Sequence, residues 1–199
     1  MYHSRYIPQV WEETQVIRRI YKIVVTGAFN SGKTTFVRNL CGRILNTDRR
    51  LYLDRERSVK ETTTVALDFG TVSIDGRTLY IFGTPGQLRF SFMWDVLSRG
   101  MHGFILLVDS NDRDSIPIAK FIYRHFKSYG NHPHVIGANK QDIENSLPPD
   151  DVRLLLEIPE NIPVLPVVSL DKSSVISVIR VLIREIEKKE MLQHTHSLL

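Results

Sequence analysis

The chain has 199 residues, a length that suits one domain with a full hydrophobic core. Hydrophobic residues make up 42% and charged residues 24%, and this balance excludes a largely disordered protein. The net charge of +4 is too small for the footprint of a dedicated nucleic-acid-binding protein, so we expect no nucleic-acid partner.

The ends of the chain carry none of the common signals for membrane attachment. No apolar run approaches the ~20 residues that span a bilayer, and residues 1–5 lack the pattern of a signal peptide. Tyr2 stands where N-myristoylation needs glycine, and residues 197–199 offer no cysteine for prenylation. The single cysteine, Cys41, is expected to be a small core residue. We therefore expect a cytoplasmic protein without a lipid anchor, with any peripheral membrane contact made through partners.

From residue 21 onward, β-rich runs alternate with segments of helical period, the pattern of a parallel sheet with helices on both faces. Residues 21–26 predict a buried strand. Residues 33–45 predict a helix, with Phe36, Leu40 and Ile44 on one face. Residues 46–61 are charged and aperiodic, and they predict a mobile loop.

A hairpin follows this loop. Its predicted strands, 65–74 and 78–82, are joined through Asp75-Gly76, a dipeptide that supplies the positive φ angles of a tight turn. Because hairpin strands are antiparallel, the sheet is expected to be mixed.

The second half of the chain continues the alternation. An amphipathic segment begins near Phe90 and ends near Gly100. Further strands are predicted at 104–108, 134–138 and 164–168, and further helices at 115–129 and 149–156. Ser173 or Ser174 can cap a final helix, whose expected buried face is Val175, Ile179, Leu182 and Ile186.

A phosphate-binding motif lies between the first predicted strand and the first predicted helix. It reads Gly27-Ala28-Phe29-Asn30-Ser31-Gly32-Lys33-Thr34 and matches G-x-x-x-x-G-K-[ST]. Glycines let successive backbone N–H groups point at phosphate oxygens, and the following helix N-terminus favours negative charge. We expect Lys33 to reach the β- and γ-phosphates and the Thr34 hydroxyl to coordinate Mg²⁺.

A second motif, Asn139-Lys140-Gln141-Asp142, follows a predicted buried strand. A carboxylate at Asp142 can accept hydrogen bonds from both N1–H and the exocyclic amine of guanine, a donor pair that adenine lacks. The Lys140 stem can lie across the base, and Asn139 can tie this loop to the phosphate loop. Together the two motifs predict a guanine-nucleotide site.

With residues 82–87 and 108–114, these motifs resemble those of the Ras-like small GTPases. Residues 109–113 and 139–142 look most like the Arf group, whereas 64–69 look like the first switch of the Rab group. This mixture, together with Gly-Thr-Pro-Gly-Gln at 83–87, is similar to the prokaryotic Ras-like GTPases of the MglA type. The resemblance covers residues 21–190 as a G domain, with 1–20 as an N-terminal extension and 191–199 as a C-terminal tail.

The resemblance implies a P-loop NTPase fold with three α/β/α layers. Its six-stranded mixed sheet would have the order 2-3-1-4-5-6, with strand 2 antiparallel. It also implies a molecular switch that hydrolyses GTP to GDP and phosphate. The implied catalytic residues are Gln87, which would orient the attacking water, Gly86, whose N–H would reach the γ-phosphate, Lys33 and the first-switch Thr64.

The same resemblance implies the contacts to nucleotide and metal. The expected nucleotide-binding residues are Gly27, Asn30, Ser31, Gly32, Lys33, Thr34, Thr35, Asn139, Lys140, Asp142, Ser169 and Leu170. Leu170 stands where the family usually has alanine. Mg²⁺ would be held by Thr34 and Thr64.

Two residues depart from the family pattern. Gly83 replaces an aspartate that supports Mg²⁺ through a coordinated water, so either extra water or a carboxylate such as Asp68 must take its place. Phe29 stands where Ras has a glycine that leaves room for the glutamine and for an arginine finger. We therefore expect slow intrinsic hydrolysis, below about 1 s⁻¹, that an activating partner raises.

By resemblance, the expected partners are effectors, a GTPase-activating protein and a Roadblock-type regulator. Two other functions remain open on the sequence. One is a GTP-binding scaffold with little or no hydrolysis, and the other is a P-loop kinase. The kinase is disfavoured because residues 139–142 favour guanine and no arginine-rich lid is evident.

Overall fold

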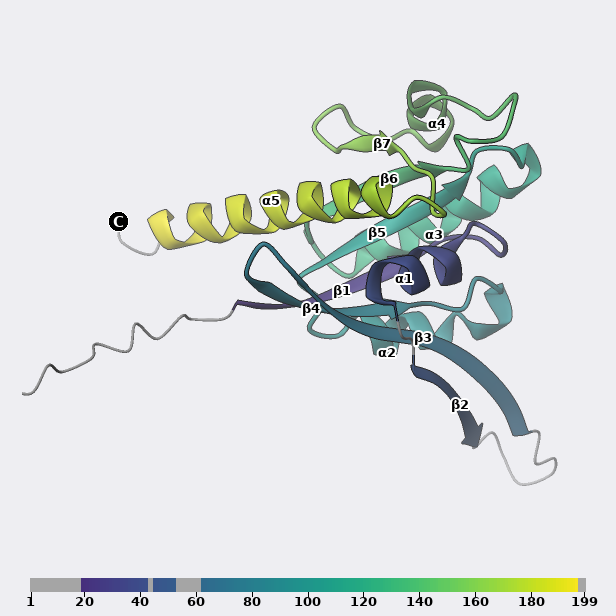
Figure 1. The fold of residues 1–199 in the computed structure, drawn as a ribbon, viewed down its shortest axis with the longest axis horizontal. Coiled ribbons are helices and arrows are strands. Elements are labelled where there is room, and N and C mark those ends of the chain that lie inside the picture. The colour runs from purple at the N-terminus through teal and green to yellow at the C-terminus, as the bar shows by residue number, and fades with distance from the viewer. Residues whose placement is uncertain (1–18, 43–44, 53–61, 197–199) are drawn as a thin grey trace, which may run out of the picture.

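The computed structural model describes residues 19–42, 45–52 and 62–196, and of residues 45–52, 62–66 and 196 it describes the backbone alone. The described chain forms one sheet with helices on both faces (Figure 1). The strands are β1 (Ile20–Thr26), β2 (Leu45–Tyr52), β3 (Thr62–Ile74), β4 (Arg77–Gly83), β5 (Gly103–Asp109), β6 (His134–Asn139) and β7 (Val164–Pro166). The helices are α1 (Lys33–Cys41), α2 (Phe92–Ser98), α3 (Ile116–Ser128), α4 (Pro149–Leu156) and α5 (Lys172–His196), with 3₁₀ turns η1 (Leu88–Phe90) and η2 (Arg113–Ser115).

The order of the strands in the described sheet is β2-β3-β4-β1-β5-β6-β7. Strands β4, β1, β5, β6 and β7 run parallel, and β3 is antiparallel to β4. From β3 onward this is the predicted order 2-3-1-4-5-6 with an antiparallel second strand, so the predicted fold class is confirmed. Because the carboxyl ends of parallel strands lie at the same end of the sheet, the loops that follow these strands meet there.

The predicted loop after the first helix is in part a strand. β2 pairs antiparallel with β3 along its whole length, and it lies at one edge of the described sheet. The prediction of a loop over 46–61 is therefore wrong for 46–52, while 53–61 lie outside the described residues. Arg49 and Arg50 suggested a loop because charges interrupt an apolar pattern. Charged residues are also typical of edge strands, where they oppose edge-to-edge association.

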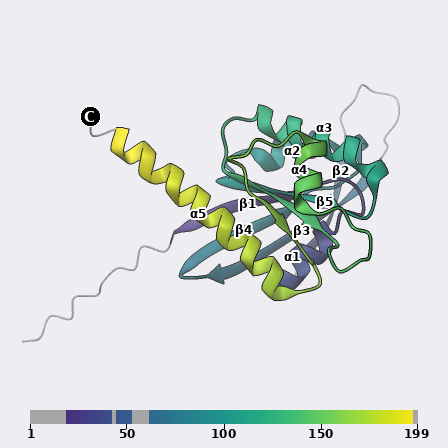
Figure 2. The same ribbon diagram turned by 90° about the horizontal axis from the view of Figure 1, so that it is seen from above.

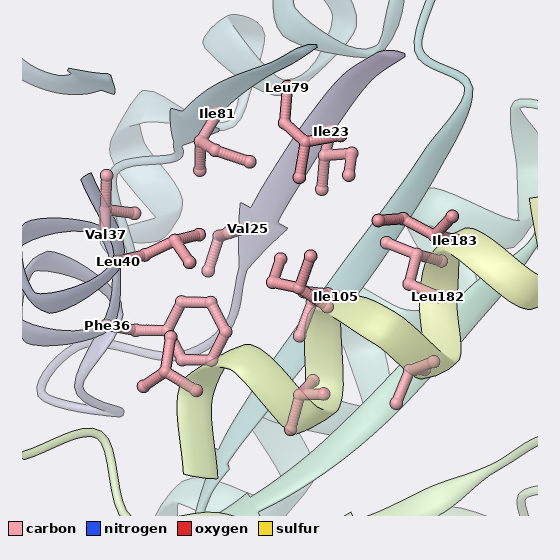
Figure 3. Packing of buried hydrophobic residues seen from close by; sticks show 14 of the residues in the cluster. Ile23, Val25, Phe36, Val37, Leu40, Leu79, Ile81, Ile105, Leu182 and Ile183 are labelled. Carbon is pink, nitrogen blue, oxygen red and sulfur yellow. The ribbon is translucent and has the colours of Figure 1, made fainter. Parts of the chain in front are cut away.

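Two hydrophobic clusters lie on the two faces of the sheet. Helices α1 and α5 cover one face, and α2, α3 and α4 cover the other (Figures 1 and 2). Figure 3 shows the first cluster, where Phe36 of α1 and Leu182 of α5 meet Ile23 and Ile105 of the central strands; all four are fully buried. The sheet is therefore packed between two layers of helices, and these layers support the strands whose carboxyl ends carry the loops.

Helix α1 is shorter than predicted. It ends at Cys41 because Gly42 adopts a φ of 74°, and the Gly42 N–H donates to the carbonyl oxygen of Arg38 at 2.9 Å. Glycine is favoured at this position because it has no Cβ penalty there. The predicted extension to residue 45 is wrong, and Ile44 lies outside the described residues. Cys41 packs against the first cluster as predicted, and burial raises the pKa of its thiol to about 11.

Helix α5 has the predicted buried face but a different cap. The Asp171 carboxylate accepts a hydrogen bond from the backbone N–H of Ser173 at 2.9 Å, so Asp171 caps the helix instead of Ser173 or Ser174. The Ser174 hydroxyl accepts from the Val168 N–H. Although α5 has 25 residues, neither it nor another helix of the described residues is long and apolar enough to cross a membrane.

A buried histidine, His134, begins β6. Its ring stacks on Phe104 with the two planes 1° apart and the centroids 4.7 Å apart. Nδ1 donates to the carbonyl oxygen of His132 at 2.8 Å, which leaves Nε2 to accept from the Tyr123 hydroxyl at 3.3 Å. Burial lowers the pKa of His134 to about 4; the hydrogen bond to the His132 carbonyl partly opposes this shift, and the charge of Lys127 adds to it.

We expect the free energy of unfolding to decrease as the pH falls from about 6.5 to about 4. In this range the unfolded chain binds a proton at His134 near its ordinary pKa of 6.5, whereas the folded protein does so only near 4. The contribution is present in full above pH 6.5, and its loss by pH 4 amounts to about 3 kcal/mol. Urea unfolding at several pH values across this range measures how steeply the free energy of unfolding depends on pH. A His134→Phe variant keeps a ring against Phe104 and should have a flatter slope; an unchanged slope would contradict the assignment.

Candidate nucleotide-binding site

The loop between β1 and α1 has two positions that only glycine can occupy. Gly27 has a φ of 148°, and a Cβ atom there would lie 2.2 Å from the carbonyl oxygen of Leu107 in β5. Gly32 has a φ of 94°, and a Cβ atom there would lie 2.2 Å from Nδ2 of Asn139. The loop therefore packs by bare backbone against β5 and the end of β6, as a phosphate loop requires.

Lys33, the first residue of α1, is buried beneath this loop. Its ammonium donates to the carbonyl oxygen of Ala28 at 2.6 Å and lies 3.4 Å from the Ser31 hydroxyl oxygen. Burial lowers the pKa of Lys33 to about 8, and the negative charge of Asp68 partly opposes this shift. Because burial disfavours the ammonium, a nearby anion would favour it strongly. The position is thus well suited to a phosphate group.

The buried Asn139 side chain joins three loops that are far apart in the sequence. Its Nδ2 donates to the Ser31 carbonyl oxygen of the phosphate loop at 2.8 Å. Its Oδ1 accepts from the backbone N–H of Ser169 at 3.0 Å and from the Ser169 hydroxyl at 2.9 Å. All three residues are buried. The phosphate loop, the loop after β6 and the loop after β7 are therefore held as one unit.

Lys140 and Asp142 follow Asn139 with different environments. Lys140 has a left-handed φ of 69°, and its ammonium pairs with the buried Asp109 carboxylate at 2.5 Å. Asp109 ends β5, so this pair fixes the direction of the Lys140 stem. Asp142 and Leu170 are exposed, and the Asp142 carboxylate is open to a ligand.

The loop after β4 packs on the phosphate loop. A Cβ atom at Gly86 would lie 2.8 Å from the Ala28 carbonyl oxygen and 2.6 Å from the Lys33 ammonium, so only glycine fits. The fully buried Trp94 of α2 donates its indole N–H to the Pro85 carbonyl oxygen at 3.0 Å and anchors this loop. Gln87 follows directly, next to the phosphate loop.

Asp68 of β3 occupies the space that an aspartate at position 83 would use. The two residues are partners across β3 and β4. A Cβ atom at Gly83 would lie 3.0 Å from the Asp68 Cβ and 3.3 Å from its Oδ2. That same Oδ2 accepts a hydrogen bond from the Thr34 hydroxyl at 2.6 Å. Of the two alternatives that the sequence left open at Gly83, this geometry favours the substituting carboxylate.

These segments line one cavity of about 500 Å³. Of the predicted site residues, it brings together Asn30, Gly32, Lys33, Thr34, Thr35, Gly86 and Gln87. Phe29 also lines it with 67% of its surface exposed, as do Asp68, Arg89 and Phe90. Arg89 is not among the site residues predicted from the sequence. Its distinguishing signal is a cation two residues after Gln87.

The remaining predicted residues lie around this cavity or outside the described side chains. Gly27, Ser31, Asn139 and Ser169 support the loop, while Lys140, Asp142 and Leu170 lie on the loops after β6 and β7 and do not line it. Thr64 is in β3 opposite Arg50 of β2, and its side chain is outside the described residues. Its contact with Mg²⁺ remains a prediction.

The sheet order, with a glycine-rich loop between β1 and α1, is that of a P-loop nucleotide-binding protein of the small-GTPase type. The family model described as "Conserved hypothetical ATP binding protein" matches residues 47–188, and the chain belongs to this family.

Curated relatives carry names from the ADP-ribosylation factor group. ADP-ribosylation factor-related protein 1 of Rattus norvegicus is 31% identical over 136 residues, which cover 67% of this chain and 65% of that protein. ADP-ribosylation factor-like protein 3 of Saccharomyces cerevisiae is 26% identical over 180 residues, covering 85% and 87%. An uncharacterized protein of Methanocaldococcus jannaschii is 31% identical over 90 residues, covering 45% and 51%. These similarities support a relationship to the Arf-like small GTPases.

Proposed function

We propose that the protein is a GTP-binding switch that hydrolyses GTP to GDP and phosphate, slowly on its own and faster with a partner. The observation that carries this proposal is the Asn139 side chain, which holds the phosphate loop, the loop of Lys140 and Asp142, and Ser169 in one unit. A nucleotide has its phosphates and its base at opposite ends. A site that fixes both loops together is suited to bind both ends at once.

Different residues bind the phosphate end and the base end of the nucleotide. In this proposal Lys33 pairs with the β- and γ-phosphates, and Gly86 donates its backbone N–H to the γ-phosphate. Gln87 orients a water molecule for attack on the γ-phosphorus. At the other end, the Asp109 carboxylate directs the Lys140 stem across the base, and Asp142 accepts two hydrogen bonds from guanine.

The oxygen atoms around Thr34 fit Mg²⁺, which prefers hard oxygen ligands and retains several waters. Bound there, the ion would neutralise charge that develops on the phosphate oxygens. Thr34 and Thr64 would supply hydroxyl oxygens, and Asp68 would orient Thr34 and a metal-bound water. Asp68 and Thr34 already share a hydrogen bond of 2.6 Å, which supports this assignment.

Slow turnover is proposed because of Phe29. Its ring lines the cavity with Gln87, and 67% of its surface is exposed. A bulky side chain there restricts both Gln87 and any arginine that a partner inserts. The MglA-type branch and a Roadblock-type regulator also remain proposals from the sequence pattern.

A competition assay tests the choice of nucleotide. Unlabelled GTP and GDP should displace labelled GDP, whereas ATP should not, because adenine lacks the N1–H and amine donor pair. The family description names ATP, so ATP displacing the label better than GTP would support that alternative and contradict our proposal.

Single-turnover hydrolysis tests the switch against a scaffold. We expect measurable GTP hydrolysis below about 1 s⁻¹ for the wild type and a slower rate for Gln87→Leu. Binding of GTP without hydrolysis, both alone and with cell extract, would favour a scaffold.

We expect nucleotide affinity to fall as the pH rises above about 8. Burial holds the pKa of Lys33 near 8 in the free protein, and a bound phosphate raises it, so binding above this pH requires proton uptake. The affinity contributed by Lys33 is complete below the free pKa and decreases by up to about tenfold per pH unit above it. Calorimetry of GDP binding in two buffers of different ionisation enthalpy measures the uptake.

Lys33→Arg is the matched control, because arginine keeps its charge throughout this range. It should bind GDP without net proton uptake at position 33. Equal proton uptake in the wild type and the variant would assign the linkage to another group.

A further inference from the structure

Arg89 is a cation at the phosphate cavity that none of the residues above neutralises. It lines the cavity two residues after Gln87, in η1. Its guanidinium carbon lies 4.7 Å from the ring centroid of Phe90, a distance typical of a cation–π contact. Among the side chains that the structure describes, no carboxylate forms an ion pair with it.

The backbone that carries Arg89 is held in place, while the side chain is exposed. The Phe90 N–H donates to the Gln87 carbonyl oxygen at 3.0 Å, and the Ser91 N–H donates to the Leu88 carbonyl oxygen at 3.0 Å. Trp94 anchors the same loop through Pro85. A surface cation–π contact is worth only about 0.5–1 kcal/mol. The guanidinium can therefore leave the Phe90 ring at little cost.

The charges of the cavity favour an anion near Arg89. The charged side chains that line it are Lys33, Asp68 and Arg89. Asp68 already accepts the Thr34 hydroxyl, and Lys33 lies below the phosphate loop. Arg89 is thus a second cation of this cavity, and it follows Gln87 by two residues. Its planar fork of N–H donors matches the oxygens of a phosphoryl group.

We propose that Arg89 is a catalytic residue. Its guanidinium moves away from the Phe90 ring and binds γ-phosphate oxygens in the transition state of GTP hydrolysis. This inference rests on the proposed function. The water oxygen forms a bond to the γ-phosphorus, and the bond from that phosphorus to the bridging oxygen breaks, with its electron pair left on GDP. The proton of the water goes to the released phosphate or to solvent. Arg89 donates hydrogen bonds and transfers no proton.

The known effect of an arginine supplied by the same chain sets the expected rate. Such GTPases turn over near 10⁻² s⁻¹, whereas a GTPase without the arginine turns over at about 3–5 × 10⁻⁴ s⁻¹. We expect the wild type near the first value, which is still below the limit of about 1 s⁻¹ given above. Arg89→Ala should reduce the hydrolysis rate by about 10–100-fold. The rate of Arg89→Lys should lie between those of the wild type and Arg89→Ala, because lysine keeps the charge but lacks the planar fork of N–H donors.

Single-turnover hydrolysis of GTP with Mg²⁺ and no partner tests this role. Arg99→Ala is the matched control, because Arg99 follows α2, is exposed and does not line the cavity. GDP affinity should be unchanged in all three variants, since Arg89 acts on the transition state. Binding of GDP with aluminium fluoride, a mimic of that state, should be lost in Arg89→Ala, weakened in Arg89→Lys and unchanged in Arg99→Ala.

The outcomes separate this inference from the proposed function. If the wild type and Arg89→Ala hydrolyse GTP at the same rate, or if the wild type binds GTP without intrinsic hydrolysis, the role of Arg89 is overturned. If the wild type does not bind GTP at all, the proposed function itself fails. An equal loss in Arg99→Ala would show that a general change of charge, and not the position of Arg89, causes the effect.

Discussion

Replacing Asp142 with asparagine is expected to weaken GTP and GDP binding by about 10²–10⁴-fold, because two hydrogen bonds to a charged acceptor contribute about 1.5–3 kcal/mol each. An asparagine side chain has one carbonyl oxygen, and its NH₂ group would face the exocyclic amine of guanine, another donor. Xanthine carries an oxygen in place of that amine. The variant should therefore prefer xanthosine diphosphate to GDP in a competition assay.

Glu144→Gln is the matched control for this experiment. Glu144 is an exposed carboxylate on the same loop, so its loss removes the same charge two residues from Asp142. It should leave the affinity for GDP within about twofold of the wild type, as a screened surface charge does. A full affinity for GDP in Asp142→Asn would place guanine recognition elsewhere. An equal loss of any ATP binding would show that the effect is not specific to guanine.

Removing the Asp68 carboxylate is expected to weaken the Mg²⁺ dependence of GTP binding by about 10–100-fold, the usual cost of losing a group that orients a metal ligand. Asp68→Ala leaves the Thr34 hydroxyl without its acceptor. Adding Gly83→Asp to this variant should restore most of the dependence, because a Cβ atom at position 83 lies 3.0 Å from the Asp68 Cβ and reaches the same space. Nucleotide affinity measured with Mg²⁺ and with a chelator gives the dependence.

Gly83→Asp alone supplies the control for this exchange. It crowds two carboxylates into one space, so it should destabilise the fold or raise the pKa of one of them. Asp68→Asn separates charge from shape, because an amide oxygen can still accept from Thr34. The assignment of Asp68 would be wrong if the wild type and Asp68→Ala bound GTP with the same dependence on Mg²⁺.

Local patterns predicted most of the fold. Strand β5 has a continuous apolar run and β1 is apolar around Lys22, while the buried face of α5 repeats at helical spacing, so these elements were predictable. The edge strand β2 was not, because its existence depends on pairing with β3 and its charges resemble those of a loop. The end of α1 was missed because the helical period continues past Gly42, while the φ of that glycine stops the helix.

The site was predictable where a motif fixes the backbone and less so where side chains from separate strands meet. The phosphate loop has its glycines at the positions that clash with any side chain, and the motif encodes them directly. Asp68 could only be offered as an alternative, because its place beside Gly83 depends on the register of β3 with β4. Arg89 was missed because its one signal, a cation two residues after Gln87, becomes informative only when the loop is seen to line the cavity.

The Asn139 bridge has a thermodynamic consequence. The Asn139 amide satisfies an acceptor of the phosphate loop and two donors of the loop after β7, so displacing either loop leaves buried polar atoms without partners. The free energies that the phosphate and base ends contribute to binding are then coupled. Substitutions at the two ends should give non-additive changes in affinity, and a double-mutant cycle measures that coupling as a property of the loops themselves.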